Sequence, residues 1–286
     1  MLKLETIAAV RGYLDPLRPA GRRVGLVPTM GALHEGHRSL MRAARAGCDV
    51  VVVSIFVNPT QFGPGEDFQH YPRPIETDLA ACREEGVDAV FVPAAAEMCP
   101  PGAVTMVAVR RFTEGLCGRF RPGHFDGVTT VVAKLFNIVQ PDRAYFGQKD
   151  AQQAVVVRQM VRDLDWPIEI VVRPTVREPD GLAMSSRNAY LSPQDRKQAV
   201  CLSAALAWAE TWIARGDRDA AKLVAGMRER IESAGPCQID YIEVVDADTL
   251  EPKSSAAGRC LVALAVRIGG ARLIDNVVVD AVGGAR

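Results

Sequence analysis

The sequence predicts an α/β fold, a Rossmann-like doubly wound parallel sheet followed by a second, smaller α+β domain. In the first half of the chain, short apolar runs alternate with segments of helical periodicity, which is the order of strand–helix–strand units. The run DVVVVSIFV is apolar on both faces, as a parallel strand covered by helices on both sides should be. Near residue 177 the alternation ends, and two long helical segments follow. We therefore expect two domains, residues 1–177 and residues 178–286.

In the first domain, strands are expected where Val- and Ile-rich runs stop at Gly or Pro, and helices where apolar residues recur every three or four positions. The expected strands are residues 22–28, 49–57, 87–93, 143–147 and 168–176. The expected helices are residues 37–47, 75–86, 128–140 and 150–165. Two stretches rich in Gly and Pro, 58–74 and 112–127, are expected to be irregular. Because parallel sheets bind ligands at the carboxyl ends of their strands, we expect the site at that edge.

The second domain is expected to begin with a polar loop that contains MSSR and to close over the site. Helices are expected at residues 193–216 and 218–235, and Leu202, Leu206 and Trp208 suit an apolar helical face. The runs at residues 238–250 and 259–279 are expected to be strands, with turn residues between them.

The composition excludes several classes of partner. Lys plus Arg and Asp plus Glu both number 34, so the formal net charge is zero, which argues against broad binding to nucleic acid or to an anionic membrane. We expect no leader sequence and no membrane-spanning segment, because the first residues lack a charged-then-apolar pattern and no apolar run is long enough to cross a bilayer. The seven cysteines are scattered and form no C-x-x-C, so we expect reduced thiols in a cytoplasmic protein.

The stretch VPTMGALHEGH, residues 27–37, is the first candidate site. Two of the four histidines, His34 and His37, stand three residues apart where a strand gives way to a helix. The start of a helix offers free N–H groups and a positive dipole end, and an imidazole can donate a hydrogen bond to phosphate. Gly31 and Gly36 let a ligand approach the backbone. This pattern predicts an anion site; the alternative is that each histidine is a surface or capping residue.

Other types of site fit this stretch poorly. A zinc site at the histidine pair would lack the H-E-x-x-H spacing and has no cysteine beside it. The dinucleotide motif G-x-G-x-x-G after a strand and the phosphate-loop motif G-x-x-x-x-G-K-[ST] are both missing. Phosphate binding would therefore depend on H-x-G-H itself.

The sequence resembles a known family through several motifs in order. H-x-G-H after the first strand resembles the signature of the nucleotidyltransferase superfamily, and MSSR resembles its second, serine-containing loop. The longer stretches PTMGALHEGH, SIFVNPTQFGPGEDFQHYPR, GHFDGVTTVVAKLFNIVQPDRAYFGQKDAQQ and REPDGLAMSSRNAYLS resemble the pantothenate synthetase (pantoate–β-alanine ligase) family. Ala151 departs from the pattern, because the family often has an aromatic residue there.

The resemblance implies a reaction in two steps. The carboxylate of pantoate attacks the α-phosphate of ATP, which gives pantoyl adenylate and pyrophosphate. The amine of β-alanine then attacks the acyl carbon, which releases AMP and pantothenate. Neither step needs a protein nucleophile, so the site has to position the substrates and stabilise charge on the phosphates.

The resemblance also implies a magnesium ion, a partner subunit and no tightly bound organic cofactor. Mg²⁺ is expected with ATP, held largely by phosphate oxygens and water. No protein ligand to the metal is assigned, although Asp78 and Asp150 are candidates. The family is often dimeric, so we expect a homodimer formed through the first domain.

By resemblance, ATP lies along H-x-G-H, the turn GQKD and the loop MSSR. The catalytic residues would be His37, His34, Lys149 and Arg187. The residues implied in ATP binding are Met30, Gly31, Ala32, Leu33, His34, Glu35, Gly36, His37, Gly147, Gln148, Lys149, Asp150, Val176, Met184, Ser185, Ser186 and Arg187. His37 matches the residue that the family treats as a proton donor, but charge stabilisation could suffice because pyrophosphate is a good leaving group.

The chemistry of these residue types supports several of the roles. Lys149 is expected at the start of a helix, where a cation is disfavoured unless an anion is bound there. Ser185 and Ser186 can donate to phosphate oxygens and Arg187 can fork onto two of them, unless MSSR is only a serine turn with a surface arginine. Asp150 is expected either to cap its helix or to contact ATP or the metal. MSSR joins the two domains, so we expect it to move and close over ATP.

Gln61 and Gln153 are the pantoate-binding residues that the resemblance implies, with Gln61 also touching β-alanine. A glutamine amide can donate and accept, which suits the hydroxyls and carboxylate of pantoate; without the resemblance both would be taken as solvated. Weaker candidates are Asn58, Tyr71, Phe56 and Phe62. No role is assigned to His70 and His124, which are expected in loops as solvated or structural residues.

Two other functions remain open from the motifs alone. One is an adenylyl- or cytidylyltransferase of the same superfamily that uses a different acceptor, and the other is a non-catalytic nucleotide-binding module. Gln61, Gln153 and their flanking stretches favour pantoate over another acceptor, and the presence of Lys149 favours an enzyme over a binding module.

Overall fold

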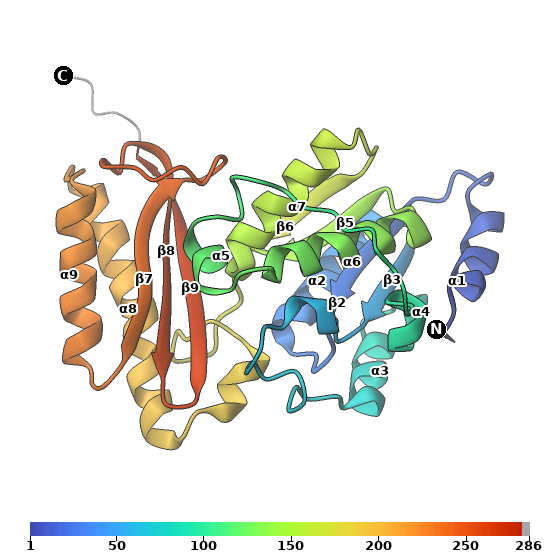
Figure 1. The fold of residues 1–286 in the computed structure, drawn as a ribbon, viewed down its shortest axis with the longest axis horizontal. Helices are drawn as coiled ribbons and strands as arrows, with labels where there is room; N and C mark the ends of the chain where they lie inside the picture. Colours follow the sequence, from blue (N-terminus) through green and yellow to red (C-terminus); the bar gives the residue numbers. More distant parts are fainter. Residues whose placement is uncertain (282–286) are drawn as a thin grey trace.

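Six parallel strands form the larger sheet, in the order β1-β4-β3-β2-β5-β6, in a computed structural model that describes residues 1–281 (Figure 1). The strands are β1 (Leu2–Leu4), β2 (Val24–Thr29), β3 (Val50–Ile55), β4 (Ala89–Phe91), β5 (Arg143–Gly147) and β6 (Glu169–Arg173). The α-helices of this part are α1 (Ile7–Leu14), α2 (Glu35–Gly47), α3 (Ile75–Glu84), α4 (Ala95–Met98), α5 (Leu116–Phe120), α6 (His124–Val139) and α7 (Ala151–Asp163). Four short 3-10 turns in the described residues are η1 (Asp15–Leu17), η2 (Pro59–Gln61), η3 (Gln148–Asp150) and η4 (Ser186–Tyr190).

The C-terminal part is a three-stranded antiparallel sheet with two long helices (Figure 1). Its elements are α8 (Pro193–Ala214), α9 (Ala220–Ser233), β7 (Gln238–Asp246), β8 (Gly258–Ile268) and β9 (Ala271–Ala281). The doubly wound parallel sheet and the smaller α+β part predicted from the sequence are therefore confirmed.

Several individual elements differ from the prediction. No structure was predicted for residues 1–21, where the short edge strand β1 and the helix α1 form. The stretch 112–127, expected to be irregular, contains α5 and the first turn of α6. As a result His124 begins a helix rather than lying in a loop. The run 259–279 is two strands, because the chain turns at Gly269 and Gly270 between β8 and β9.

The strand order reverses between β2 and β5, and these two strands pair only briefly. β2 pairs with β3 over all six of its residues, from Val24 to Thr29, but with β5 only at Gly25 and Leu26. The carboxyl ends of β2 and β5 are therefore free to separate. A strand-order reversal of this kind is where open α/β sheets bind their ligands.

Side chains on the two faces of the larger sheet belong to separate cores. On one face, Val24 and Leu26 of β2 pack in a cluster with residues of α1, α6 and α7. On the other face, Val27 packs in a cluster with residues of α2 and α3. This two-sided coverage explains why the strands are apolar in runs rather than in alternation.

The C-terminal sheet is also covered on both faces. On β8, Leu261 and Ala263 face the first core, whereas Val262 and Leu264 face α8 and α9. The C-terminal sheet thus lies between its own two helices and the larger domain (Figure 1). The boundary after residue 177 stays a prediction.

Two further expectations concern membranes and cysteines. Across residues 1–281, every helix is too short or too polar to span a bilayer. All seven cysteines lie within this range, and each has a free thiol.

Gly127 lets α6 approach η2, and a substitution there tests this contact. A Cβ on Gly127 would lie 2.3 Å from the carbonyl oxygen of Thr60, so Gly127→Ala should destabilise the protein by about 1–3 kcal/mol. Gly12 lies inside α1, and a Cβ there would have no atom within 4 Å. Gly12→Ala should therefore stabilise by up to about 1 kcal/mol. Urea unfolding of both variants checks the prediction, which is contradicted if the two changes have the same sign.

Candidate active site

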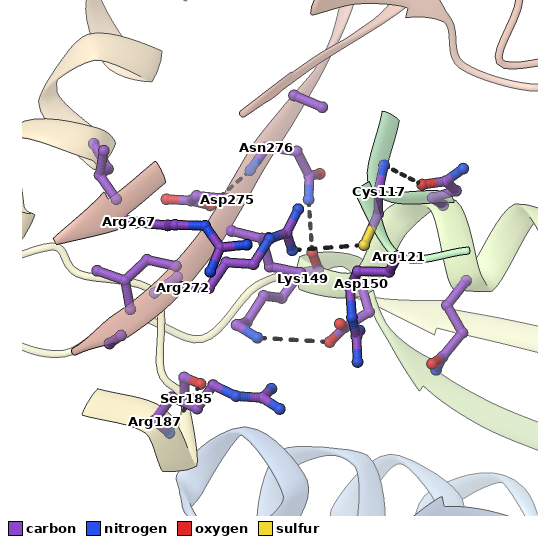
Figure 2. Close-up of a pocket in the computed structure, with 18 of the residues that line it drawn as sticks. Cys117, Arg121, Lys149, Asp150, Ser185, Arg187, Arg267, Arg272, Asp275 and Asn276 are labelled. Atoms are coloured by element: carbon purple, nitrogen blue, oxygen red, sulfur yellow. Dashed lines mark hydrogen bonds and ion pairs between the residues drawn. The ribbon is translucent and has the colours of Figure 1, made fainter. Parts of the chain in front are cut away.

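A cavity of about 230 Å³ lies at the carboxyl ends of β2 and β5. A second cavity of about 440 Å³ adjoins it on the side of the C-terminal sheet (Figure 2). Both cavities are lined by Lys149, Asp150, Gln153, Ser185 and Arg187. The predicted site residues that line the first cavity are Met30, His34, Gly36, His37, Gln61, Gly147, Lys149, Asp150, Gln153, Val176, Met184, Ser185, Ser186 and Arg187. The fold therefore brings H-x-G-H, GQKD, MSSR and both glutamines to one place.

Five residues of the predicted ATP-binding set do not line either cavity. They are Gly31, Ala32, Leu33, Glu35 and Gln148. The side chain of Glu35 pairs with Arg42 on the surface of α2. A contact of these five residues with ATP stays a prediction.

The backbone before His34 is shaped by the buried carboxylate of Asp78. Its two oxygens accept hydrogen bonds from the N–H groups of Ala32, at 2.9 Å, and Leu33, at 2.8 Å. Gly31 has a φ of 85°, and a Cβ there would lie 2.9 Å from Asp78 Oδ2. Burial raises the pKa of Asp78, against the lowering effect of the two N–H donors. Asp78 is a candidate metal ligand from the sequence. In the structure both of its carboxylate oxygens bind backbone N–H groups of the loop before His34.

His34 and His37 face each other at the start of α2, with ring centroids 4.1 Å apart. His34 is the N-cap residue, and its Nδ1 accepts from the N–H of Gly36 at 3.1 Å. His37 Nδ1 accepts from the N–H of His34 at 3.3 Å. Because both Nδ1 atoms are acceptors, each neutral ring carries its proton on Nε2. The capping alternative is therefore correct, and it leaves each ring with one N–H donor for a ligand.

The same surroundings keep both histidines uncharged. Burial and the charge of Lys149 lower the pKa of His34 to about 4. Burial, followed by the charges of His34 and Lys149, lowers the pKa of His37 well below its usual value. At neutral pH the pair therefore offers hydrogen-bond donors rather than acids.

Gln61 is held by residues on two sides of the first cavity. Asn58, which is only 2% exposed, donates from Nδ2 to Gln61 Oε1 at 3.1 Å and to the carbonyl of Gly127 at 3.0 Å. Gln61 Nε2 lies 3.1 Å from Met30 Sδ. His124 Nδ1 bonds the carbonyl oxygen of Gln61 at 2.8 Å, so this histidine has a structural role. His70 is exposed.

Lys149 lies in the turn η3, next to Asp150. Its Nζ is 3.7 Å from Asp150 Oδ2, and its side chain is 21% exposed. Asp150 occupies the N-cap position of α7, but its side chain makes no capping hydrogen bond. The capping role considered for Asp150 is therefore wrong, which leaves its carboxylate to the cavity.

The loop MSSR is connected to the loop that follows β3. Ser185 Oγ accepts from the N–H of Arg187 at 3.2 Å, and Ser186 Oγ lies 3.3 Å from the hydroxyl of Tyr71. Arg187 forks onto the carboxylate of Asp67, with Nε at 3.0 Å and Nη2 at 2.9 Å. The guanidinium that the sequence assigns to phosphate thus has a carboxylate partner in this structure.

A metal site made by the protein alone does not fit the structure. Within residues 1–281 there is no group of three or more His, Cys, Asp or Glu side chains placed to hold an ion. Asp78 is committed to backbone N–H groups, and Asp150 pairs with Lys149.

Sequence reasoning missed two buried polar residues of β9 that contact the site. Asp275 is 3% exposed and Asn276 is 5% exposed. Asp275 binds Arg177, and Asn276 binds the backbone of η3. The available signal was two adjacent polar residues inside an apolar strand, since buried polar groups in a strand need specific partners.

Comparisons with known proteins agree on one family. A family model described as pantoate-beta-alanine ligase matches residues 3–278. A pantothenate synthetase of Moorella thermoacetica is 59% identical over 277 residues, which cover 97% of this chain and 98% of the relative. The crystal structure of pantothenate synthetase from Thermus thermophilus matches with a TM-score of 0.92 and 47% identity, covering 97% of this chain and 99% of that chain.

A third match has ligands in its description. It is the pantoate-beta-alanine ligase from Francisella tularensis complexed with beta-gamma ATP and beta-alanine, with a TM-score of 0.80 and 36% identity over 97% of each chain. Because the family model and these relatives cover nearly the whole length, the chain belongs to the pantoate–β-alanine ligase family.

Proposed function

We propose that this chain is an ATP-dependent ligase that condenses pantoate with β-alanine to pantothenate at the carboxyl ends of β2 and β5. The observation that carries the proposal is convergence on one cavity. Donor groups of H-x-G-H, GQKD and MSSR line it together with Gln61 and Gln153. A triphosphate and a small hydroxy acid need such donors side by side.

The reaction proceeds through a pantoyl adenylate. A carboxylate oxygen of pantoate bonds to the α-phosphorus of ATP while the bond to the bridging oxygen breaks and pyrophosphate leaves. The amine nitrogen of β-alanine then bonds to the acyl carbon, the bond to AMP breaks, and the nitrogen releases a proton to solvent. Positioning and charge stabilisation drive both steps.

Each segment has a part in this scheme. The Nε2–H groups of His34 and His37 donate to the α-phosphate, and because both rings are neutral, they stabilise charge without transferring a proton. Lys149 follows β5, across the cavity from the histidines, and its ammonium group neutralises charge on the phosphates. MSSR binds the outer phosphates when Arg187 exchanges Asp67 for ATP, and its movement closes the site.

Pantoate is held on the other side of the first cavity. Gln61, with its amide oriented by Asn58, and Gln153 bind pantoate, and Gln61 also contacts β-alanine. Of the alternatives, a transferase with another acceptor has no need for this pair of amides. A non-catalytic nucleotide-binding module has no need for a second, acid-binding pocket.

The proposal also covers the ion, the assembly and the location. Mg²⁺ would accompany ATP and would be held largely by phosphate oxygens and water, since the described part of the protein offers no group of three or more His, Cys, Asp or Glu side chains for it. The chain forms a homodimer through the first domain. Exposed Val104 and Met106 in residues 103–110, which lack regular structure, support an interface there. The enzyme works in the cytoplasm.

Pyrophosphate release tests the proposed function. With ATP and pantoate present, the chain should release pyrophosphate, and adding β-alanine should yield pantothenate and AMP. Release that does not depend on pantoate would contradict the ligase assignment and favour another acceptor.

Lys149→Ala and His37→Ala should each reduce kcat for pantoate-dependent pyrophosphate release by about 100-fold or more, because each removes a preorganised donor to the phosphates. Lys149→Ala should unfold at nearly the wild-type temperature, and His37→Ala, which removes an acceptor from the cap of α2, should still fold but unfold at a somewhat lower temperature. Lys222→Ala, which removes a lysine that is 78% exposed on α9, is the matched control. Near-normal turnover in either test variant would exclude the role given to that residue.

Stability should depend on pH through His34. Its pKa falls from 6.5 in the unfolded chain to about 4 in the folded protein, so the unfolded chain binds more protons between these values. The contribution of neutral His34 to the free energy of unfolding is therefore complete above pH 6.5 and is lost as the pH falls towards 4. His34→Asn keeps a capping acceptor without a titrating group. Urea unfolding from pH 7 to 4 should show a shallower loss for this variant, and equal slopes would contradict the assignment.

A further inference from the structure

We propose that Asn276 is a positioning residue for adenylation, which holds the turn that carries Lys149. The inference rests on the proposed function, in which Lys149 contacts the phosphates of ATP. Asn276 belongs to β9 of the C-terminal sheet, whereas Lys149 follows β5 of the larger sheet.

All the polar atoms of the Asn276 side chain are used by this turn. Nδ2 donates to the carbonyl oxygen of Gln148 at 3.0 Å and to that of Lys149 at 2.9 Å. Oδ1 accepts from Gln148 Nε2 at 2.9 Å. Figure 2 shows the side chain of Asn276 pointing from its strand to the turn beside Lys149. The amide thus binds two successive backbone groups and one side chain of η3.

This arrangement needs an amide. Two carbonyl oxygens require two N–H donors and Gln148 Nε2 requires an acceptor, and a side chain that carries an NH2 group beside an acceptor oxygen is found in Asn and Gln. A carboxylate at position 276 would place an acceptor against acceptors. An alanine would remove both donors from two partly buried carbonyl groups.

The position of Lys149 depends on this anchor because the turn has little other support. The turn η3 is three residues long, and Asp150 does not cap the helix that follows. In residues 1–281, the ion pair of Lys149 Nζ is with Asp150, the adjacent residue, at 3.7 Å. That pair moves with the turn and cannot fix it. Asn276 ties the turn to β9, an edge strand of the C-terminal sheet that pairs with β8 along its length.

The preceding residue of β9 anchors the chain that leads to MSSR. Asp275 accepts from Arg177, with Nη1 at 2.6 Å and Nη2 at 3.1 Å. Arg177 pairs with Ala183 directly before MSSR. Asp275 and Asn276, which are consecutive residues of β9, therefore connect the C-terminal sheet to GQKD and MSSR, two of the three segments proposed to bind ATP.

Pantoate-dependent pyrophosphate release by Asn276→Ala and Asn276→Asp tests the proposal. Each should lower kcat by about tenfold or more, because a displaced Lys149 stabilises the transition state less. The KM for pantoate should stay within about threefold, because Gln61 and Gln153 are untouched. The decisive comparison is the double variant. If Asn276 acts through Lys149, adding Asn276→Ala to the Lys149→Ala variant should lower kcat by less than about twofold.

Controls separate positioning from general destabilisation. Val277→Ala, the next residue of β9, removes partly buried apolar contacts without touching η3 and should lower thermal stability while kcat is kept. Asn137→Asp makes the same chemical change at an exposed position of α6. A full, independent loss from Asn276→Ala in the Lys149→Ala background would overturn the proposal. Wild-type protein that releases no pyrophosphate from ATP and pantoate would instead overturn the proposed function.

Discussion

The site exists because β2 and β5 pair at only two positions. β2 is bound to β3 along its whole length, so it cannot follow β5 as the two strands separate. The opening lies at the reversal of strand order, where the chain leaves β2 towards α2 and β5 towards α7. Backbone and side-chain donors from both strands therefore meet across one crevice. Neither strand could supply the whole set, because the donors approach a ligand from opposite sides.

Buried polar side chains hold the loops around this crevice in place. Asp78 fixes the backbone before His34, Asn58 orients Gln61, and Asn276 binds the turn of Lys149. Each of them uses its polar atoms on neighbouring protein groups and has little exposure. Fully paired polar groups of this kind make a site rigid, and rigidity lets donors act without a cost of reorganisation during the reaction.

The larger sheet could be predicted from the sequence because it depends on local signals, the apolar runs and helical periods that indicate strands and helices. The segments that line the site could be predicted mainly because H-x-G-H, GQKD and MSSR resemble the motifs of a known family. The supporting residues could not be predicted, because their partners are remote in the chain. Asn276 lies 127 residues from the carbonyl of Lys149. The sequence makes Asp78 a candidate metal ligand, since nothing local indicates that the backbone of Ala32 and Leu33 faces its carboxylate.

The cations of the site explain how a chain of zero net charge can bind a triphosphate. Arg187 is paired with Asp67 and Arg121 with Glu66, and both acids belong to the loop after β3. These pairs keep the crevice close to neutral, which limits the repulsion among the cations that line it. On the proposed roles, ATP competes with Asp67 for Arg187, and the phosphate brings more charge and more acceptors than one carboxylate. On these roles, exchange of that partner removes the ion pair between the loop after β3 and MSSR and leaves the contact of Tyr71 with Ser186, so nucleotide binding is coupled to rearrangement of both loops.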